Sequence, residues 1–452
     1  MTIVSDALRQ ELVQIIGEKR LITKGSRLKR NSQDAYWYSP ILKAQLEDKS
    51  ADLIAQPSTL DELVATIAAC VKAGVPITPR GAGTGNYGQS IPIHGGVTIS
   101  TRSMGNILEL AADYARVEAG TILLNIEREA RKIGAELRFF PSTLPTSTAA
   151  GFLAGGSAGA GSIKWGNVWD AGNILGATVV TIEAEPQIIT ITDPQELQGI
   201  IHNCGLSAFI ADLTFALAPA QPWQQYVVAF NTFEDALRCG NALAFDDDLP
   251  TRLVAVQEWP IPSYFGKLVK ANACPEGKAI LLLHLTLEPD EVATMMAEYG
   301  GEVTWHNPTA GAHKNTIELT DYSWNHTTLW AMKADPSITY LQDAFHPDKV
   351  FEQLAQRKAK YGDSVIEHVT FSRSAGRLRP VGLTLVRFQS AEHLIGLMQF
   401  CESIGIEQYS PHTTYLDDDD RWFGQPILDA KARWDPHQLL NPGHLRSMEA
   451  SQ

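Results

Sequence analysis

Cysteine is scarce in this sequence, and no two cysteines have the spacing of a metal or redox motif. The five cysteines lie far apart among 452 residues, at Cys70, Cys204, Cys239, Cys274 and Cys401. This excludes a disulfide framework and a cysteine-based zinc site, and it is typical of reduced, mostly structural thiols. The sequence also lacks an apolar run long enough to span a bilayer. Its first twenty residues lack the basic start and apolar block of a signal peptide. We therefore expect a cytoplasmic protein without membrane insertion.

The sequence also contains fewer basic than acidic residues. Lys and Arg number 37 against 51 Asp and Glu, a net charge of -14. Such a balance repels nucleic acids and anionic membrane surfaces, so neither is a predicted partner. A hydrophobic fraction of 44% and a charged fraction of 19% are those of an ordinary globular protein. The length exceeds one compact core, so two or three domains are expected.

Glycine, in contrast, is concentrated in two places. The first is "PRGAGTGNYGQ", which contains Gly81, Gly83, Gly85 and Gly88. A dinucleotide-binding Rossmann loop requires a helix directly after its glycines. Here the following segment contains Pro92 and a Gly95–Gly96 pair and has no helical period. A nicotinamide-binding Rossmann fold is therefore not expected at this position.

The second concentration, residues 141–173, interleaves glycines with serines and threonines. Hydroxyl groups and free backbone N–H groups are the donors that a pyrophosphate or a sugar needs. Either loop alone could be a plain turn. Because each glycine-rich loop lies at the end of a helix–strand segment, the two loops together indicate a long ligand that is bound from two sides.

Hydrophobic periodicity predicts alternating helices and strands. A helix over 60–71 begins at a capping box of Thr59 and Glu62 and stops at Gly74. Strands are predicted at 75–79, 96–101, 115–120 and 135–142, with a helix at 121–134. After an Ala- and Pro-rich segment at 215–222, strand–helix repeats recur at 223–243, 279–301 and 376–405. These repeats predict an antiparallel sheet with helices on one face.

The order of these pieces resembles the FAD-binding domain of the p-cresol methylhydroxylase / vanillyl-alcohol oxidase superfamily. The resemblance lies in "VPITPRGAGT", in "TSTAAGFLAGGSAGAGSIKWG" and in the closing "DPHQLLNPGHL". It implies an α+β fold with a two-subdomain FAD-binding domain at 1–219, whose motif core is about 46–219. It further implies an α+β cap with an antiparallel sheet at 220–408, and a C-terminal segment at 409–452 that returns to the FAD domain.

The resemblance also implies which residues hold the FAD. In several relatives the first loop ends in a histidine that bonds covalently to the flavin, and Thr84 stands at that position. Non-covalent FAD is therefore expected. The implied cofactor-binding residues are Arg80, Gly81, Ala82, Gly83, Thr84, Gly85, Asn86, Gln89, Ser90, Pro141, Ser142, Thr148, Gly151, Gly155, Gly156, Ser157, Gly161, Ser162 and Asn441.

The implied activity is oxidation of a small alcohol or a 2-hydroxy acid, with hydride transfer to flavin N5 and reoxidation by oxygen or another acceptor. Such a reaction needs a base for the hydroxyl proton, and histidine or tyrosine can serve. His412 ranks first because it lies in a segment expected to cross the domain junction. The full set of candidates for catalysis and substrate binding is His412, Tyr415, Tyr409, His326, His368 and Arg373.

One branch of the family carries "H-x-G-D-G-N-x-H" in its cap, a metal and carboxylate site. The corresponding strand here, "LLLHLTLEP", has only His284, and Asp417 to Asp420 are best interpreted as a solvated loop, so no metal is expected. At this point the sequence departs from a standard 2-hydroxy-acid dehydrogenase of that branch, although Arg373 could pair a substrate carboxylate. The alternative is a flavin-binding subunit or non-catalytic homologue of a redox assembly. A small-molecule substrate is expected, and a homo-oligomer or an electron-acceptor protein stays open as a partner.

Overall fold

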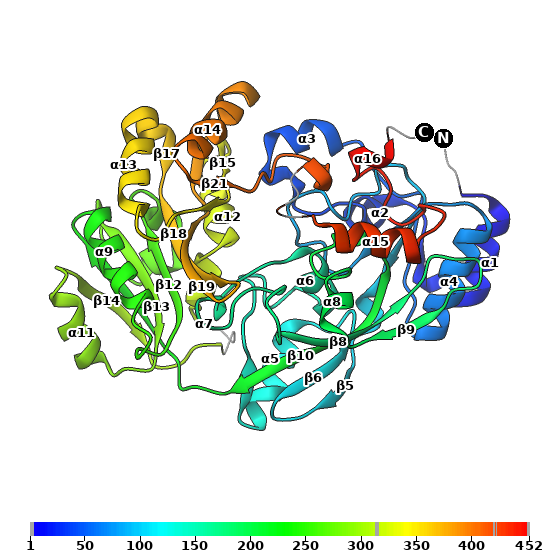
Figure 1. The fold of residues 1–452 in the computed structure, drawn as a ribbon, viewed down its shortest axis with the longest axis horizontal. Helices are drawn as coiled ribbons and strands as arrows, with labels where there is room; N and C mark the ends of the chain where they lie inside the picture. Colours follow the sequence, from blue (N-terminus) through cyan, green and yellow to red (C-terminus); the bar gives the residue numbers. More distant parts are fainter. Residues whose placement is uncertain (1–3, 312–315, 419–420, 422, 450–452) are drawn as a thin grey trace.

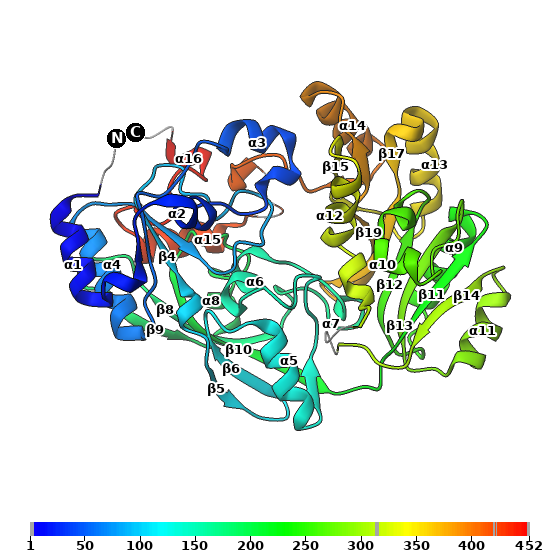
Figure 2. The same cartoon turned by 180° about the vertical axis from the view of Figure 1, so that it is seen from behind.

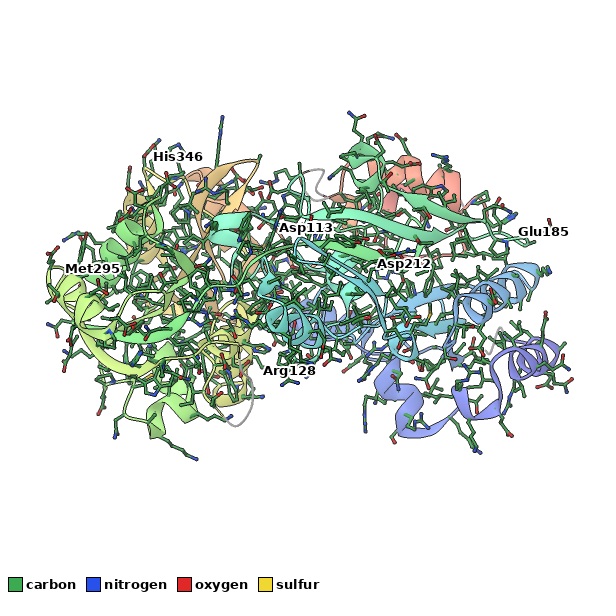
Figure 3. All side chains as sticks on the ribbon, turned by 90° about the horizontal axis from the view of Figure 1, so that it is seen from below. Asp113, Arg128, Glu185, Asp212, Met295 and His346 are labelled. Atoms are coloured by element: carbon green, nitrogen blue, oxygen red, sulfur yellow. The ribbon has the colours of Figure 1, made fainter. Side chains whose placement is uncertain are left out.

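The computed structural model describes residues 4–311, 316–418, 421 and 423–449 as two lobes that lie side by side (Figure 1). Met295 and Glu185 mark opposite ends of the elongated molecule (Figure 3). One lobe contains a four-stranded and a six-stranded sheet, and the other contains an eight-stranded and a three-stranded sheet. Among the described residues, no helix combines the length and the apolarity needed to cross a membrane.

The four-stranded sheet places the first glycine-rich loop. Its central strand β4 pairs in parallel with β2 and β3, and β1 pairs with β2 antiparallel. Its elements are β1 (Leu21–Ile22), β2 (Leu53–Ala55), β3 (Ile77–Arg80), β4 (Val97–Ser100), α1 (Asp6–Ile16) and α4 (Leu60–Lys72). Thr59 caps α4 as predicted, by accepting a hydrogen bond from Glu62 N. The Glu62 carboxylate does not complete the predicted box, because it accepts from Ser58 N and pairs with Arg20 instead.

The six-stranded sheet is antiparallel, with strand order β5-β6-β10-β8-β9 and β7 paired to β10. Leu123 and Ile126 of one helix and Phe152 and Leu153 of another pack into its core. The elements are β5 (Ile107–Leu110), β6 (Tyr114–Glu118), β7 (Ala135–Leu137), β8 (Ile174–Val180), β9 (Ile188–Ile191), β10 (Phe209–Pro219), α5 (Leu123–Lys132), α6 (Ala149–Gly155) and α8 (Pro194–Leu197).

The eight-stranded sheet is antiparallel throughout, with order β14-β11-β13-β12-β18-β19-β16-β21. Its strands are β11 (Gln224–Phe230), β12 (Thr251–Gln257), β13 (Ala279–Leu285), β14 (Glu302–Asn307), β16 (Asp343–Ala344), β18 (His368–Ser374), β19 (Arg377–Gly382) and β21 (Glu407–Gln408). The three-stranded sheet beside it has the order β15 (Ile338–Tyr340), β20 (Leu385–Arg387), β17 (Val365–Ile366).

The prediction that helices cover only one face of this sheet was wrong. Leu281 and Leu283 of β13 pack under helices on one face, whereas Ile280 and Leu282 pack on the other. A strand buried on both faces appears in sequence as an unbroken apolar run, and "AILLL" is such a run. The first face carries α9 (Phe233–Ala244), α11 (Pro289–Ala297), α13 (Val350–Tyr361) and α14 (Ala391–Ser403), and the second carries α10 (Gly266–Lys270) and α12 (Asn325–Ala334).

The chain crosses between the lobes twice. It leaves the six-stranded sheet at Pro219 and enters the eight-stranded sheet at Gln224. After β21 it returns to the first lobe, where α15 (Gln425–Trp434) packs against the six-stranded sheet and Leu440 pairs with Ile77 (Figure 1). We propose to divide the chain into domains at these crossings, near residues 219 and 408.

Candidate functional site

A cavity of about 600 Å³ lies between the two lobes, a size typical of cofactor and ligand sites. Both glycine-rich loops line it, together with strand ends of the second lobe. Helices α6 and α7 (Ser162–Trp165) lie at this junction in both views (Figures 1 and 2). The cavity therefore has one wall of bare backbone and hydroxyl groups and one wall from the second lobe.

The two glycine-rich loops meet at Gly81 and Thr148. A Cβ on Gly81 would lie 2.1 Å from Thr148 Oγ1, so only glycine permits this approach. Thr148 caps α6 by accepting a hydrogen bond from Gly151 N. The hydroxyl group that would collide with a side chain at position 81 therefore also orders the second loop.

A buried arginine stands at the start of the first loop. Arg80 is 7% exposed, and its guanidinium lies within hydrogen-bonding distance of Ser90 Oγ and Arg30 O. Burial raises the pKa of the nearby Asp34 to about 6, although Ser90 and the charge of Arg80 act in the opposite direction. The loop thus combines glycine backbone with one positive charge, a combination that suits an anionic group.

The first loop also contacts the second lobe. Asn86 Nδ2 donates to Tyr340 Oη at 2.6 Å, and Gln342 Nε2 donates to Tyr87 Oη at 2.7 Å. Thr84 lines the cavity and shares a hydrogen bond with Ser147 Oγ at 3.2 Å. Its hydroxyl group therefore forms part of the cavity wall at the end of the first loop.

Of the nineteen cofactor residues expected from the sequence, all but three line the cavity. Gly161 and Ser162 lie behind it, where Gly161 N donates to Arg252 O and Ser162 Oγ accepts from Gly159 N. Asn441 Nδ2 bonds the carbonyl groups of Gln89 and Cys204. These three residues brace the loops, and none of them forms the wall.

Among the expected catalytic residues, only Tyr409 lines this cavity. Its hydroxyl group donates to Glu407 Oε2 at 3.1 Å, and burial raises the pKa of Tyr409. Tyr415 lines an adjoining chamber, and its ring lies 4.0 Å from the Arg446 guanidinium carbon.

His412, ranked first from the sequence, also lines the adjoining chamber. Its Nε2 donates to Tyr340 O at 2.9 Å, so its Nδ1 accepts from Ser39 Oγ at 2.8 Å. Burial lowers the pKa of His412 to about 4. With both ring nitrogens engaged, the residue links the two lobes, and we no longer propose it as the base.

The other three candidates lie outside the cavity lining. His368 is fully buried on β18, where burial lowers its pKa to about 3. His326 lies near the start of α12, where burial lowers its pKa to about 4. Arg373 donates to Gly376 O and pairs with the exposed Asp247, on the opposite side of β18 from the cavity.

The arginine that faces the cavity from this hairpin is Arg379. The hairpin turns at Ala375 and Gly376, both with positive φ, and Ser372 then pairs with Arg379. Directly paired residues share a sheet face, and Ser372 and Arg379 both line the cavity. The turn in "SRSAGRLR" fixes this register, so strict counting from the turn could have found Arg379 in the sequence.

A second arginine, Arg421, lies beside it, above the Tyr409 ring at 5.3 Å. Sequence reasoning missed it because it follows the aspartate run and belongs to no periodic element. Among the described residues, the charged side chains that line the cavity are Arg80, Arg379, Arg421 and Asp343, and Arg357 already pairs Asp343 at 2.6 Å. Arg379 and Arg421 also pair with Glu407 and Glu402 outside this lining, and an arginine wall of this kind can receive an anionic group.

The two lobes are also connected at the cavity rim. Ser372 Oγ donates to Asn167 Oδ1 at 2.7 Å, and Trp169 Nε1 donates to Ser374 Oγ at 3.1 Å. His202 lies behind Trp169, with its Nδ1 bonded to Gly156 O. Trp169 and His202, which the sequence did not single out, also line the cavity.

The residues present fit FAD. Glycine backbone, the hydroxyl groups of Ser142, Thr148 and Ser157 and the charge of Arg80 are the donors that a pyrophosphate and a ribityl chain need. No group of three or more His, Cys, Asp or Glu residues in the described part of the chain could hold a metal ion.

Comparison with known proteins leads to the same cofactor. Residues 51–191 match the family model of an FAD binding domain. The chain is 24% identical over 435 residues to "Glycolate oxidase subunit GlcD" of Bacillus subtilis (strain 168), covering 88% of this chain and 90% of that protein. It is 26% identical over 198 residues to "D-lactate dehydrogenase" of Archaeoglobus fulgidus, covering 41% of this chain and 43% of the relative.

Among solved structures, an alkyldihydroxyacetonephosphate synthase matches with a TM-score of 0.73 at 15% identity, covering 97% of this chain and 85% of the other. This likeness shows a shared fold of mixed helix and sheet. Residues 51–191 are thus an FAD-binding domain, the oxidase and dehydrogenase relatives support the FAD-linked oxidase superfamily that the sequence analysis indicated, and the chain is an FAD-dependent oxidoreductase.

Proposed function

We propose that the protein oxidises a 2-hydroxy carboxylic acid to the 2-oxo acid. The observation that carries this proposal is the pair of arginines on the second-lobe wall of the cavity, Arg379 and Arg421. The named activities of the relatives, a glycolate oxidase subunit and D-lactate dehydrogenases, concern 2-hydroxy acids and support the same class. Arginine is well suited to carboxylates because its planar fork can donate two parallel hydrogen bonds.

Arg379 is the better placed of the two arginines. Its Nη1 donates to Glu407 Oε2 at 3.0 Å, and its Nε has no hydrogen-bond partner among the described residues. Its side chain is 25% exposed, so a substrate carboxylate would reach its Nη atoms, whereas the Nε is itself buried. We assign Arg379 the substrate carboxylate and Arg421 a supporting positive charge.

Tyr409 would orient the substrate hydroxyl group. It lies between the two arginines in sequence, lines the cavity and donates to Glu407. Its pKa is raised by burial, so the phenol is neutral near pH 7 and can accept a hydrogen bond from the substrate while donating its own proton to Glu407. Bound FAD would supply the hydride acceptor for C2 of the substrate. The hydroxyl proton of the substrate would pass to Tyr409 as Tyr409 gives its own proton to the Glu407 carboxylate.

We propose that sixteen of the nineteen residues predicted to hold the FAD contact it directly, and that Gly161, Ser162 and Asn441 position the loops. With Thr84 at the site of the covalent histidine, the flavin should be held non-covalently. Acid precipitation of the purified protein is expected to release one FAD per chain into the supernatant. Flavin that remains with the precipitate would contradict this expectation, and recovery of FMN would contradict the assignment of a pyrophosphate to the two loops.

The word "subunit" in the names of the GlcD relatives supports a second possibility, a flavin subunit that works only within an assembly. The two proposals differ in what the isolated chain does without oxygen. We expect 2-hydroxy acids to bleach the flavin absorbance of the isolated holoprotein, because the cavity contains both the carboxylate site and the hydroxyl contact. Bleaching that appears only after a partner protein is added would favour the assembly.

A further inference from the structure

A second chamber of about 440 Å³ adjoins the main cavity. The two share four lining residues, Tyr87, His202, Cys204 and Arg421, which lie where they meet. The chamber lies between α14 and the C-terminal segment that returns to the first lobe. A molecule held at the arginines therefore lies beside this space.

The side chains that the chamber presents to a ligand are mainly apolar. Six of them line it: Ile41, Leu394, Ile395, Met398, Leu416 and Phe423. Most of its polar groups already have protein partners, since Gln408 bonds Asp343, both nitrogens of His412 are engaged, Glu402 accepts from Arg421 and Asp418 pairs with Arg446. An apolar chain therefore gains contacts there without breaking these bonds.

The chamber reaches the surface at α14. Ile395 lines it and is 48% exposed, whereas Leu394 beside it is fully buried. Arg421 lies where the chamber meets the main cavity; its side chain is 40% exposed, and its guanidinium is held by Gln408 O at 2.8 Å and by the Glu402 carboxylate at 3.2 Å. A ligand whose carboxylate binds in the main cavity would extend its apolar end past Arg421 along the chamber.

We propose that the second chamber binds the aliphatic tail of the substrate, so that the protein acts on 2-hydroxy acids with a medium-length alkyl chain. This inference rests on the proposed function for the placement of the carboxylate. The substituents of C2 diverge, so the carboxylate contacts Arg379, the hydroxyl group contacts Tyr409 and the tail passes Arg421 into the chamber. The chamber, and not the arginines, then distinguishes this substrate from glycolate or lactate.

The test uses saturated acids that lack the hydroxyl group and cannot be oxidised. Calorimetric titration of the FAD-loaded protein with acetate, butyrate, hexanoate and octanoate measures affinity without turnover. Each buried methylene raises affinity about fourfold. Since the outer end of the chamber is open, we expect octanoate to bind at least tenfold more tightly than butyrate.

Two variants locate this dependence on chain length. Met398→Trp fills the chamber, and Ile395→Asn removes apolar surface at an exposed position where folding is not at risk. Both variants should reduce the increase in affinity from butyrate to octanoate. The matched control is Phe351→Asn, an exposed apolar side chain on α13 that lies outside the chamber, and it should keep the wild-type increase.

Equal affinities for butyrate and octanoate in the wild type, or an unchanged increase in both chamber variants, would overturn the inference. If in addition glycolate and lactate bleach the flavin, the proposed function stands and only the tail site fails. If octanoate binds through the chamber but no 2-hydroxy acid of any length bleaches the flavin, the tail site stands and the proposed function fails.

Discussion

Arg357→Met should destabilise the protein by about 3–5 kcal/mol, the usual cost of removing one partner from a buried ion pair. Arg357 is fully buried and bonds two carboxylates, Asp343 at 2.6 Å and Glu367 at 2.5 Å. Methionine would fill the volume but leave both carboxylates without their cation. Because Asp343 lines the cavity, the substitution should also expose the bound substrate to an unbalanced negative charge.

The pH dependence identifies the cause of this loss. Burial already raises the pKa of Glu367 in the parent protein, and without Arg357 that carboxyl group should take up a proton still more readily. The difference in unfolding free energy between parent and variant should therefore be larger at pH 8 than at pH 5. Urea denaturation at both pH values measures it. Arg433→Met, which breaks an exposed pair with Glu196, is the control and should cost less than about 1 kcal/mol.

A drop from pH 7 to pH 5 should lower the free energy of unfolding by roughly 6 kcal/mol. Burial lowers the pKa of His202, His326, His412 and His444 to about 4 and that of His368 to about 3. In the unfolded chain these side chains titrate near pH 6.5. Below that pH the unfolded state binds protons that the folded state does not, so stability falls as the pH falls.

Each of these five histidines should contribute about 1.8 kcal/mol to the loss between pH 7 and pH 5. The buried carboxyl group of Asp34, whose pKa is about 6, acts in the opposite direction by about 1.3 kcal/mol because the folded state gains that proton first. Glu367 and Asp435 have pKa values that are also raised by burial, and they add to this offset. Equal urea midpoints at the two pH values would contradict the account. His444→Asn should reduce the loss by about 1.8 kcal/mol.

The glycine-rich wall of the cavity was largely predictable from sequence because it is local. The glycines around Gly81 and Gly155 lie in short segments, and their backbone lines the cavity whatever the rest of the chain does. Elements with strong periodicity were predictable for the same reason. The helix predicted over 60–71 is α4, Leu60–Lys72, and its cap is the predicted Thr59.

The wall of the cavity that comes from the second lobe was not predictable to the same degree, because it depends on strand register and on long-range packing. A shift of one residue in the pairing register of the β18–β19 hairpin decides whether Arg373 or Arg379 faces the cavity, since neighbouring side chains on a strand point to opposite faces. His412 has the right residue type in a crossing segment, but its ring nitrogens are engaged by Ser39 and Tyr340, which lie far away in sequence. Nothing local to "PHTTY" could have indicated those two contacts.

The measurement that tests the central claim most directly is anaerobic stopped-flow reduction of the flavin by 2-hydroxybutyrate and by 2-hydroxybutanamide. The two molecules have nearly the same shape, and only the acid has the charge that Arg379 should pair. A charge-assisted hydrogen bond contributes about 1.5–3 kcal/mol, so the acid should reduce the flavin at least ~10-fold faster at limiting concentration. In Arg379→Met that preference should nearly disappear. Equal rates for acid and amide in the parent protein, or an undiminished preference in Arg379→Met, would contradict the assignment of this cavity to a 2-hydroxy acid.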